Sequence, residues 1–128
     1  MNMKQLEHDL LTNKYTTVYH EEGFNFNAPH TFDVVTMQDR LDGKEGELPV
    51  AIQRIHFQEG AIKEHGVNGV MNEDLIAMII CRLEHFNQSE FRCRENSMAI
   101  TKLEEALLWL RKRTIGREKR GVEGTHTK

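Results

Sequence analysis

The sequence has few cysteines and no long apolar run. Cys81 and Cys93 are the only cysteines in 128 residues, too few for a disulfide framework, and a reducing cytosol would keep both as thiols. No apolar stretch approaches the roughly 18 residues of a membrane span, and none resembles the hydrophobic region of a signal peptide. We therefore expect a cytosolic protein that has no contact with a membrane.

The short motifs of common enzyme sites are also missing. No Gly-rich phosphate loop follows a predicted strand, and there is no nucleophile elbow. Glu104 and Glu105 are neighbours in a predicted helix and point about 100° apart, which favours a solvated helix face. Cys81 and His85 have a spacing that could chelate zinc, but no second ligand pair follows, and a small buried thiol is the favoured interpretation. We expect no catalytic residue, no metal and no cofactor.

The composition is that of one globular domain, with an uneven charge distribution. Hydrophobic residues make up 38% and charged residues 29%, which is ordinary for such a domain. Residues 111–120 contain six positive residues and one glutamate, a net charge of +5, so the remainder carries −8 within a total of −3. A concentrated positive patch on an acidic chain indicates a local anion site rather than general attraction to nucleic acid.

Residues 72–120 are predicted to form an antiparallel helical hairpin. Apolar residues recur at steps of three and four in two segments, separated by the seven residues 87–93. Asn72 is the expected N-cap of the first helix. The first stripe contains Leu75, Ile76, Ile79, Ile80, Leu83 and Phe86, and the second contains Ala99, Leu103, Ala106, Leu107, Leu110 and Thr114.

The preceding residues predict a small antiparallel sheet, so the expected fold is α+β. Residues 1–13 are expected to form a short helix, and residues 14–20, 31–37 and 49–58 are expected to form strands. Turn-forming residues at 42–47 predict a long, polar hairpin tip. The expected organisation is a β-rich part at 1–60, a Gly-containing loop at 61–71, the hairpin at 72–120, and a tail at 121–128 with little to bury.

Both ends of the predicted hairpin offer binding groups. Arg113 and Arg117 are four residues apart and project two guanidinium forks from one helix face, as a phosphate or pyrophosphate requires. A solvated, basic helix end explains the same residues and is favoured on composition alone. At the other end, Phe86 either closes the core or stacks on a nucleobase, and Asn96 either caps its helix or reads a base edge.

Several motifs together resemble those of the phage Thoeris anti-defence protein one family. They are Gly66-Val67-Asn68-Gly69, Asn72-Glu73, Cys93-Arg94-Glu95-Asn96, Thr101-Lys102-Leu103-Glu104-Glu105-Ala106-Leu107, Trp109-Leu110, Arg113-Thr114 and Arg117. The similarity runs from about residue 60 to the tail. The Thr-Lys-Leu-Glu-Glu-Ala core is shared with the anti-CBASS protein two hairpin, while the Gly-Val-Asn-Gly loop and the paired arginines narrow the resemblance to the anti-Thoeris branch.

This resemblance implies a non-enzymatic sponge acting in the host bacterial cytoplasm. Such proteins bind glycocyclic ADP-ribose, the signal made by bacterial TIR-domain proteins, and some hold cyclic di- or trinucleotides. The ligand contacts carried over are Phe86, Asn96, Arg113 and Arg117. His85 stands where the family pattern has glycine and Asn87 where it has glutamine, so the base-side pocket differs in shape.

Helix geometry then places the two ends of the hairpin too far apart for one small ligand. Asn96 and Arg113 are 17 residues apart, or about 25 Å along one helix. If all four residues serve one pocket, Phe86 and Asn96 come from one chain and Arg113 and Arg117 from another. A two-fold homodimer with antiparallel hairpins would build two such pockets, and dimers could assemble into hexamers. The alternatives are a small nucleic-acid-binding phage regulator that uses the basic helix, and an enzyme that degrades the signal.

Overall fold

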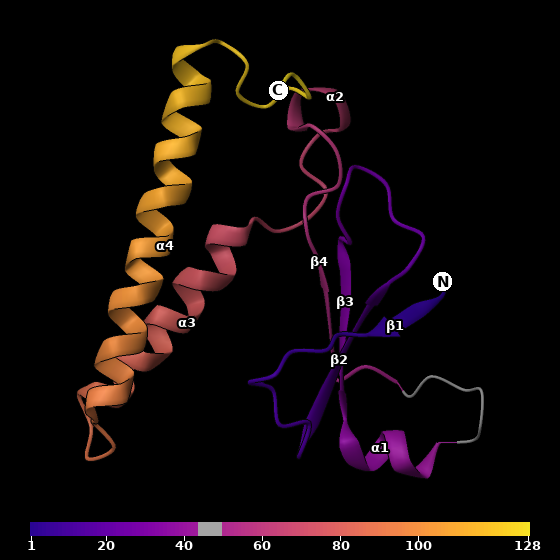
Figure 1. Cartoon of the computed structure of the whole chain (residues 1–128), viewed down its shortest axis with the longest axis vertical. Helices are drawn as coiled ribbons and strands as arrows, with labels where there is room; N and C mark the ends of the chain where they lie inside the picture. The colour runs from indigo at the N-terminus through magenta and orange to yellow at the C-terminus, as the bar shows by residue number, and fades with distance from the viewer. Residues whose placement is uncertain (44–49) are drawn as a thin grey trace. The chain divides into compact units, whose positions relative to one another are not determined.

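The computed structural model describes residues 1–43 and 50–128, which divide into two compact units. The first unit is Met1–Gly60 with Val67–Gly69, and the second is Ala61–Gly66 with Val70–Lys128. The strands belong to the first unit and the helical hairpin to the second (Figure 1). The predicted α+β class is confirmed.

The first unit is built on a four-stranded antiparallel sheet. The strands are β1 (Met3–Gln5), β2 (Thr16–Glu21), β3 (Thr31–Thr36) and β4 (Gln53–His56), paired in the order β1-β2-β3-β4. β3 and β4 lie within the predicted strand segments, and β2 overlaps the segment predicted at 14–20 and extends one residue beyond it. The helix predicted over residues 1–13 is wrong, because Met3–Gln5 pairs with β2 as an edge strand and Leu10 is 84% exposed, so the leucines form no buried helical stripe.

The sheet has a small buried interior and an ion pair between two of its strands. Val35 and its cross-strand partner Thr17 are almost fully buried. On the neighbouring pair of strands, Arg54 makes two hydrogen bonds to the Asp33 carboxylate, at 2.7 and 2.8 Å. These hydrogen bonds and the charge of Asp33 raise the pKa of Arg54. Since Asp33 is buried, this ion pair compensates the desolvation of its carboxylate.

The segment between β3 and β4 begins with a helix. Helix α1 (Met37–Asp42) starts where the Thr36 hydroxyl accepts a hydrogen bond from the Asp39 amide, at 3.0 Å. The pattern of residues 37–42 did not predict this helix. Most of the predicted polar tip and the start of the predicted strand at Pro49 lie outside the described residues. The observed strand begins only at Gln53.

In the Gly-Val-Asn-Gly motif, Gly69 lies where two backbone segments approach each other closely. A Cβ placed on Gly69 would lie 2.5 Å from the Phe57 carbonyl carbon, so only glycine allows the two backbones to approach. Asn68 joins the same two segments, since its side chain accepts from the Glu59 amide and donates to the Glu59 carbonyl, both at 2.8 Å. The motif therefore closes the loop against β4 and its following residues. The predicted 61–71 loop also contains a short helix, α2 (Ile62–His65), which was not predicted.

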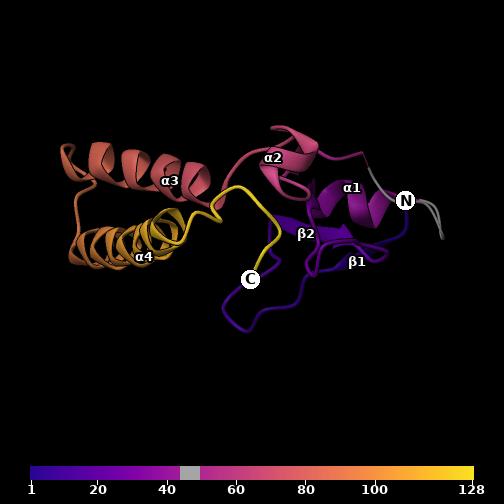
Figure 2. The same ribbon diagram turned by 90° about the horizontal axis from the view of Figure 1, so that it is seen from above.

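The second unit contains the predicted hairpin. Helices α3 (Asn72–Asn87) and α4 (Arg94–Lys119) lie side by side in both ribbon views (Figures 1 and 2). The N-cap of α3 is Met71 rather than the predicted Asn72, and the Met71 amide donates to the Asp74 carboxylate at 2.9 Å. The α4 stripe is half-buried as predicted, while Ile80, at 9% exposed, is the one buried residue among the described hydrophobic residues of the two helices.

Candidate functional site

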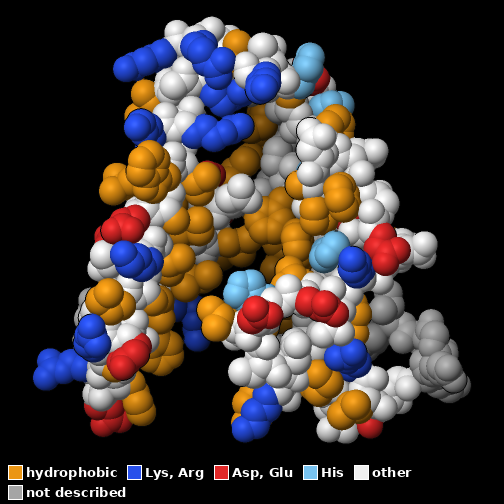
Figure 3. Space-filling view, viewed as in Figure 1, with side chains coloured by type: hydrophobic (Ala, Val, Ile, Leu, Met, Phe, Trp, Pro, Cys, Tyr) orange, Lys and Arg blue, Asp and Glu red, His pale blue; other side chains and the backbone are white. Residues whose placement is uncertain are grey.

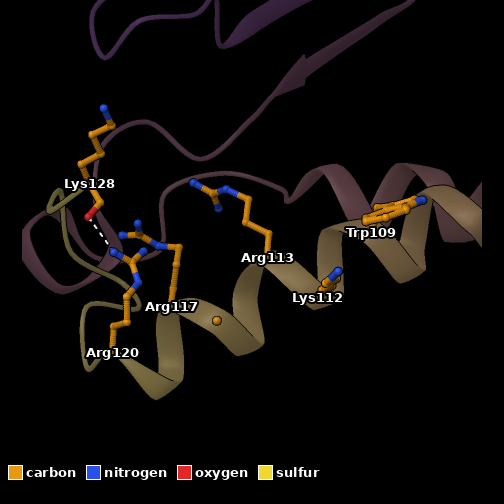
Figure 4. Close-up of a pocket in the computed structure, with 7 residues that line it drawn as sticks. Trp109, Lys112, Arg113, Arg117, Arg120 and Lys128 are labelled. Carbon is orange, nitrogen blue, oxygen red and sulfur yellow. Dashed lines mark hydrogen bonds between the residues drawn. The ribbon is translucent and has the colours of Figure 1, made fainter.

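A basic pocket lies at the C-terminal end of α4. Lys and Arg side chains gather there (Figure 3), around a cavity of about 520 Å³. This volume suits a small-molecule ligand. Five of the lining side chains are cationic, which favours a phosphate-containing ligand. The lining residues are Trp109, Lys112, Arg113, Gly116, Arg117, Arg120 and Lys128 (Figure 4).

Arg113 contributes a complete guanidinium fork to this pocket. The side chain is exposed, and across residues 1–43 and 50–128 it forms no hydrogen bond or ion pair. The neighbouring Arg111 differs, since it is paired with Glu118 at 3.1 Å. Arg113 therefore keeps all five N–H donors for a ligand, including an edge suited to two oxygens of one phosphate.

Arg117 also lines the pocket, but its guanidinium is partly engaged. Its Nη2 donates to the main-chain oxygens of Val122, at 3.0 Å, and Thr125, at 2.9 Å. These two bonds use both Nη2 hydrogens and leave one N–H on Nε and two on Nη1. Arg113 and Arg117 thus share a pocket as the spacing predicts, but Arg117 offers three donors where a free fork offers five.

The residues after α4 fold back, contrary to the prediction of a tail with little to bury. Gly121, with φ +75°, ends the helix: the Gly121 amide donates to the Glu118 carbonyl and the Val122 amide to the Arg117 carbonyl, each at 3.0 Å. This pattern is a Schellman motif, which reverses the chain direction. Residues 122–125 are half-buried. The prediction failed because this segment accepts hydrogen bonds from Arg117 and Arg120 through its own main-chain oxygens, which carry no side-chain signal.

The turn end of the hairpin presents an aromatic surface. Phe86 is 42% exposed, so it does not close the core. The Arg82 guanidinium carbon lies 5.5 Å from the centre of its ring. Phe86 also lines a cavity of about 430 Å³, together with Cys81, Arg82, His85, Ser89 and Phe91. An exposed ring beside a guanidinium can stack on a nucleobase.

Asn96 lies nearby in the first turn of α4, and it is not the cap. The helix begins after Cys93, whose amide donates to Asn87 Oδ1 at 3.3 Å, while Asn87 Nδ2 donates to Ser97 Oγ at 3.0 Å. Asn87 therefore connects the turn to α4. The half-buried amide of Asn96 makes no hydrogen bond within the described chain and is available to a ligand.

One chain does not bring the four predicted contacts together. Helix α4 is continuous over 26 residues from Arg94 to Lys119, so Asn96 and Arg113 are separated by about 25 Å along its axis. The basic pocket contains Arg113 and Arg117, whereas Phe86 lines the cavity at the turn. The geometry of the single chain therefore leaves the four residues in two separate groups at opposite ends of the hairpin.

The cysteine interpretation needs correction. Cys81 is exposed rather than buried, and its Sγ lies 3.7 Å from His85 Nδ1, which also contacts the Cys81 carbonyl oxygen at 2.8 Å. Cys81 lies outside the apolar stripe that faces α4, which explains its exposure. Within the described residues no group of three potential ligands is placed to hold a metal ion, and no helix has the length and apolarity to cross a membrane.

Two further contributions to the basic pocket were missed from the sequence. Trp109 is 68% exposed and carries the Lys112 ammonium 5.0 Å from its ring centre. Lys128 is distant in sequence from α4 and reaches the pocket because the tail folds back. Trp109 could have been identified from its spacing of four residues to Arg113, which places both on one face of the helix. Nothing in the sequence identifies Lys128.

Two comparisons establish the family. Residues 49–114 match the model described as "Acb2/Tad1, hairpin domain". The whole chain is also similar to a protein of Bacillus phage SBSphiJ7 named "Thoeris anti-defense 1", with 51% identity over 142 aligned positions that cover 98% of this chain and 100% of the relative. The chain therefore belongs to the phage Thoeris anti-defence protein one family, within the group that carries the Acb2/Tad1 hairpin domain.

Proposed function

We propose that this protein is a non-enzymatic sponge that binds and sequesters a cyclic nucleotide immune signal, chiefly glycocyclic ADP-ribose. It would act in the cytoplasm of the infected bacterium, where TIR-domain proteins make that signal. Cyclic di- and trinucleotides are secondary ligands. The family supports an anti-defence role, because the relative from phage SBSphiJ7 is named for one. The basic pocket supports the choice of ligand.

The observation that carries the proposal is the pairing of Arg113 and Arg117 in one pocket. A pyrophosphate presents several oxygens within a few ångströms, and two arginines one helical turn apart can contact both phosphates. The cavity of about 520 Å³ is large enough for these groups and an attached ribose. Its lining residues are cations, a tryptophan and a glycine, which suit binding and include no carboxylate or histidine to act as a general base.

The complete site is proposed to form between two chains. The turn end supplies Phe86 for the adenine and Asn96 for a base edge, and the opposite end of a partner hairpin supplies the arginines. An antiparallel two-fold dimer places these ends next to each other twice. Exposed apolar side chains on both helices favour such an association; they include Met78, Ile79, Met98, Leu108, Trp109 and Ile115.

A depletion and recovery assay tests this function. The protein is mixed with glycocyclic ADP-ribose, the free ligand is measured after filtration, and the protein is then heat-denatured. A sponge removes the ligand from solution and returns it with unchanged mass. A changed mass would identify an enzyme and overturn the proposal. No depletion, together with salt-dependent binding of DNA or RNA, would instead support the nucleic-acid-binding regulator.

Two variants localise the binding in that assay. Arg113→Ala should lose depletion while remaining folded, because the pocket loses its one uncommitted fork. Lys119→Ala is the matched control, since Lys119 is an exposed cation on the same end of α4 that does not line the pocket. Equal depletion by both variants would contradict the assignment of the pocket.

A further inference from the structure

We propose that residues 122–128, the C-terminal tail, act as a positioning element of the binding site by holding the Arg117 guanidinium in place. The inference deepens the proposed function and rests on it for the identity of the natural ligand. It assigns a role to a segment that touches the pocket mainly through main-chain atoms.

The first step is the contact between the tail and Arg117. Both hydrogens of Nη2 are directed to tail carbonyls, those of Val122 and Thr125. The Thr125 hydroxyl also contacts the Val122 carbonyl oxygen, so the two acceptors are linked. Two hydrogen bonds at the tip of the Arg117 side chain leave it few accessible rotamers. Less side-chain entropy is therefore lost when a ligand binds to it.

The second step is that the tail is itself anchored away from the pocket. The Lys63 amide of α2 donates to the Gly124 carbonyl at 2.8 Å, and the His126 ring pairs with the Glu64 carboxylate. A Cβ added to Gly124, which has φ +75°, would lie 3.1 Å from the Lys63 side chain. The tail therefore lies against α2 in a conformation that glycine alone adopts without strain.

The third step is that this arrangement directs cations to the pocket. Arg120 Nη1 donates to the main-chain oxygen of Lys128 at 3.0 Å, which holds the end of the tail beside the cavity (Figure 4). The Nε and Nη1 hydrogens of Arg117 remain uncommitted. The tail thus gives Arg117 a fixed orientation and brings Lys128 to the lining of the pocket.

Inorganic pyrophosphate is the probe for this role, with the emission of Trp109 as the readout. Trp109 is the only tryptophan and it lines the pocket. A chain ending at Gly121 should bind pyrophosphate about fivefold or more weakly than Lys128→Ala, which removes the cation but keeps the tail hydrogen bonds. Gly124→Val, which displaces the tail while retaining Lys128, should show a similar loss. Circular dichroism verifies that both variants keep their helices.

The same comparison in an Arg117→Ala background separates positioning from general support of the fold. Lys128→Ala is added to that background, because displacement of the tail also moves Lys128 away from the pocket. If the tail acts through Arg117, Gly124→Val should then have no further effect on pyrophosphate affinity. An equal loss in both backgrounds, unchanged affinity of the tail variants, or no pyrophosphate binding by the wild-type protein would each overturn the inference. Tail-dependent pyrophosphate binding without any glycocyclic ADP-ribose binding would overturn the proposed ligand and leave the role of the tail in place.

Discussion

Arg113 and Arg117 lie one helical turn apart in the same pocket, but only Arg117 is held by hydrogen bonds, to Val122 and Thr125. The two residues are therefore not equivalent, although the sequence presents them as a symmetrical pair. Arg113 is free to form a two-pronged contact with a phosphate, and Arg117 offers single donors from a fixed position. This difference leads to separate expectations for the two arginines.

Substitution of Arg113 should be the more damaging for ligand affinity. Arg113→Ala is expected to weaken glycocyclic ADP-ribose binding by about 100-fold or more, since it removes at least two charge-assisted hydrogen bonds. Arg113→Lys should recover only part of this loss, because an ammonium cannot form the paired contact. Isothermal titration calorimetry measures both. Retained nanomolar affinity in Arg113→Ala would show that the pocket is wrongly assigned.

Substitution of Arg117 should have a second effect, on the tail. Arg117→Ala removes the donor for Val122 and Thr125, so amide hydrogen exchange of residues 122–126 is expected to accelerate. Arg113→Ala is the matched control and should leave that exchange unchanged, since among the described residues Arg113 makes no hydrogen bond to the tail. Equal protection of the tail in both variants would contradict its attachment to Arg117.

Gly116 should be replaceable with a gain in stability. It lies inside α4, and a Cβ added there meets nothing within 4 Å. Gly116→Ala is therefore expected to raise the free energy of unfolding by about 1 kcal/mol through helix propensity. Urea denaturation at a fixed protein concentration measures this change. A destabilised variant would mean that another group occupies this space in the assembled protein.

Gly69, in contrast, should not tolerate a methyl group. Gly69→Ala would place Cβ 2.5 Å from the backbone of Phe57 and is expected to cost about 2 kcal/mol or more of stability. Gly23→Ala is the matched control, because its Cβ would have no neighbour within 4 Å and the change should stay within about 0.5 kcal/mol. Similar unfolding midpoints for the two variants would disprove the close approach at Gly69.

The helical hairpin was the most predictable part of the chain, for a physical reason. Two stripes of apolar residues at helical spacing, separated by a short connection, permit few other arrangements. The ends were less well predicted. Met71 is the N-cap of α3, and its amide donates to the carboxylate of Asp74, which lies inside the helix. The prediction of Asn72 considered only side chains that cap a helix from its first position, so it did not include this hydrogen bond.

The sheet and the tail show where sequence patterns are insufficient. β1 is three residues long and owes its conformation to pairing with β2, a non-local effect that overrides the leucine spacing of residues 1–13. The tail depends on main-chain acceptors and on Gly121 and Gly124. Arg113 and Arg117 were found from spacing, whereas the engagement of Arg117 became visible only once the tail was placed.

The most direct test of the account is complementation between two inactive chains. Phe86→Ala and Arg113→Ala disable opposite ends of the hairpin and should each abolish tight glycocyclic ADP-ribose binding as homodimers. Coexpressed with different tags and purified as a heterodimer, they should recover one intact pocket, so that about half the wild-type binding sites return at wild-type affinity. A heterodimer that binds no ligand, or a wild-type protein that is strictly monomeric, would contradict a site shared between two chains.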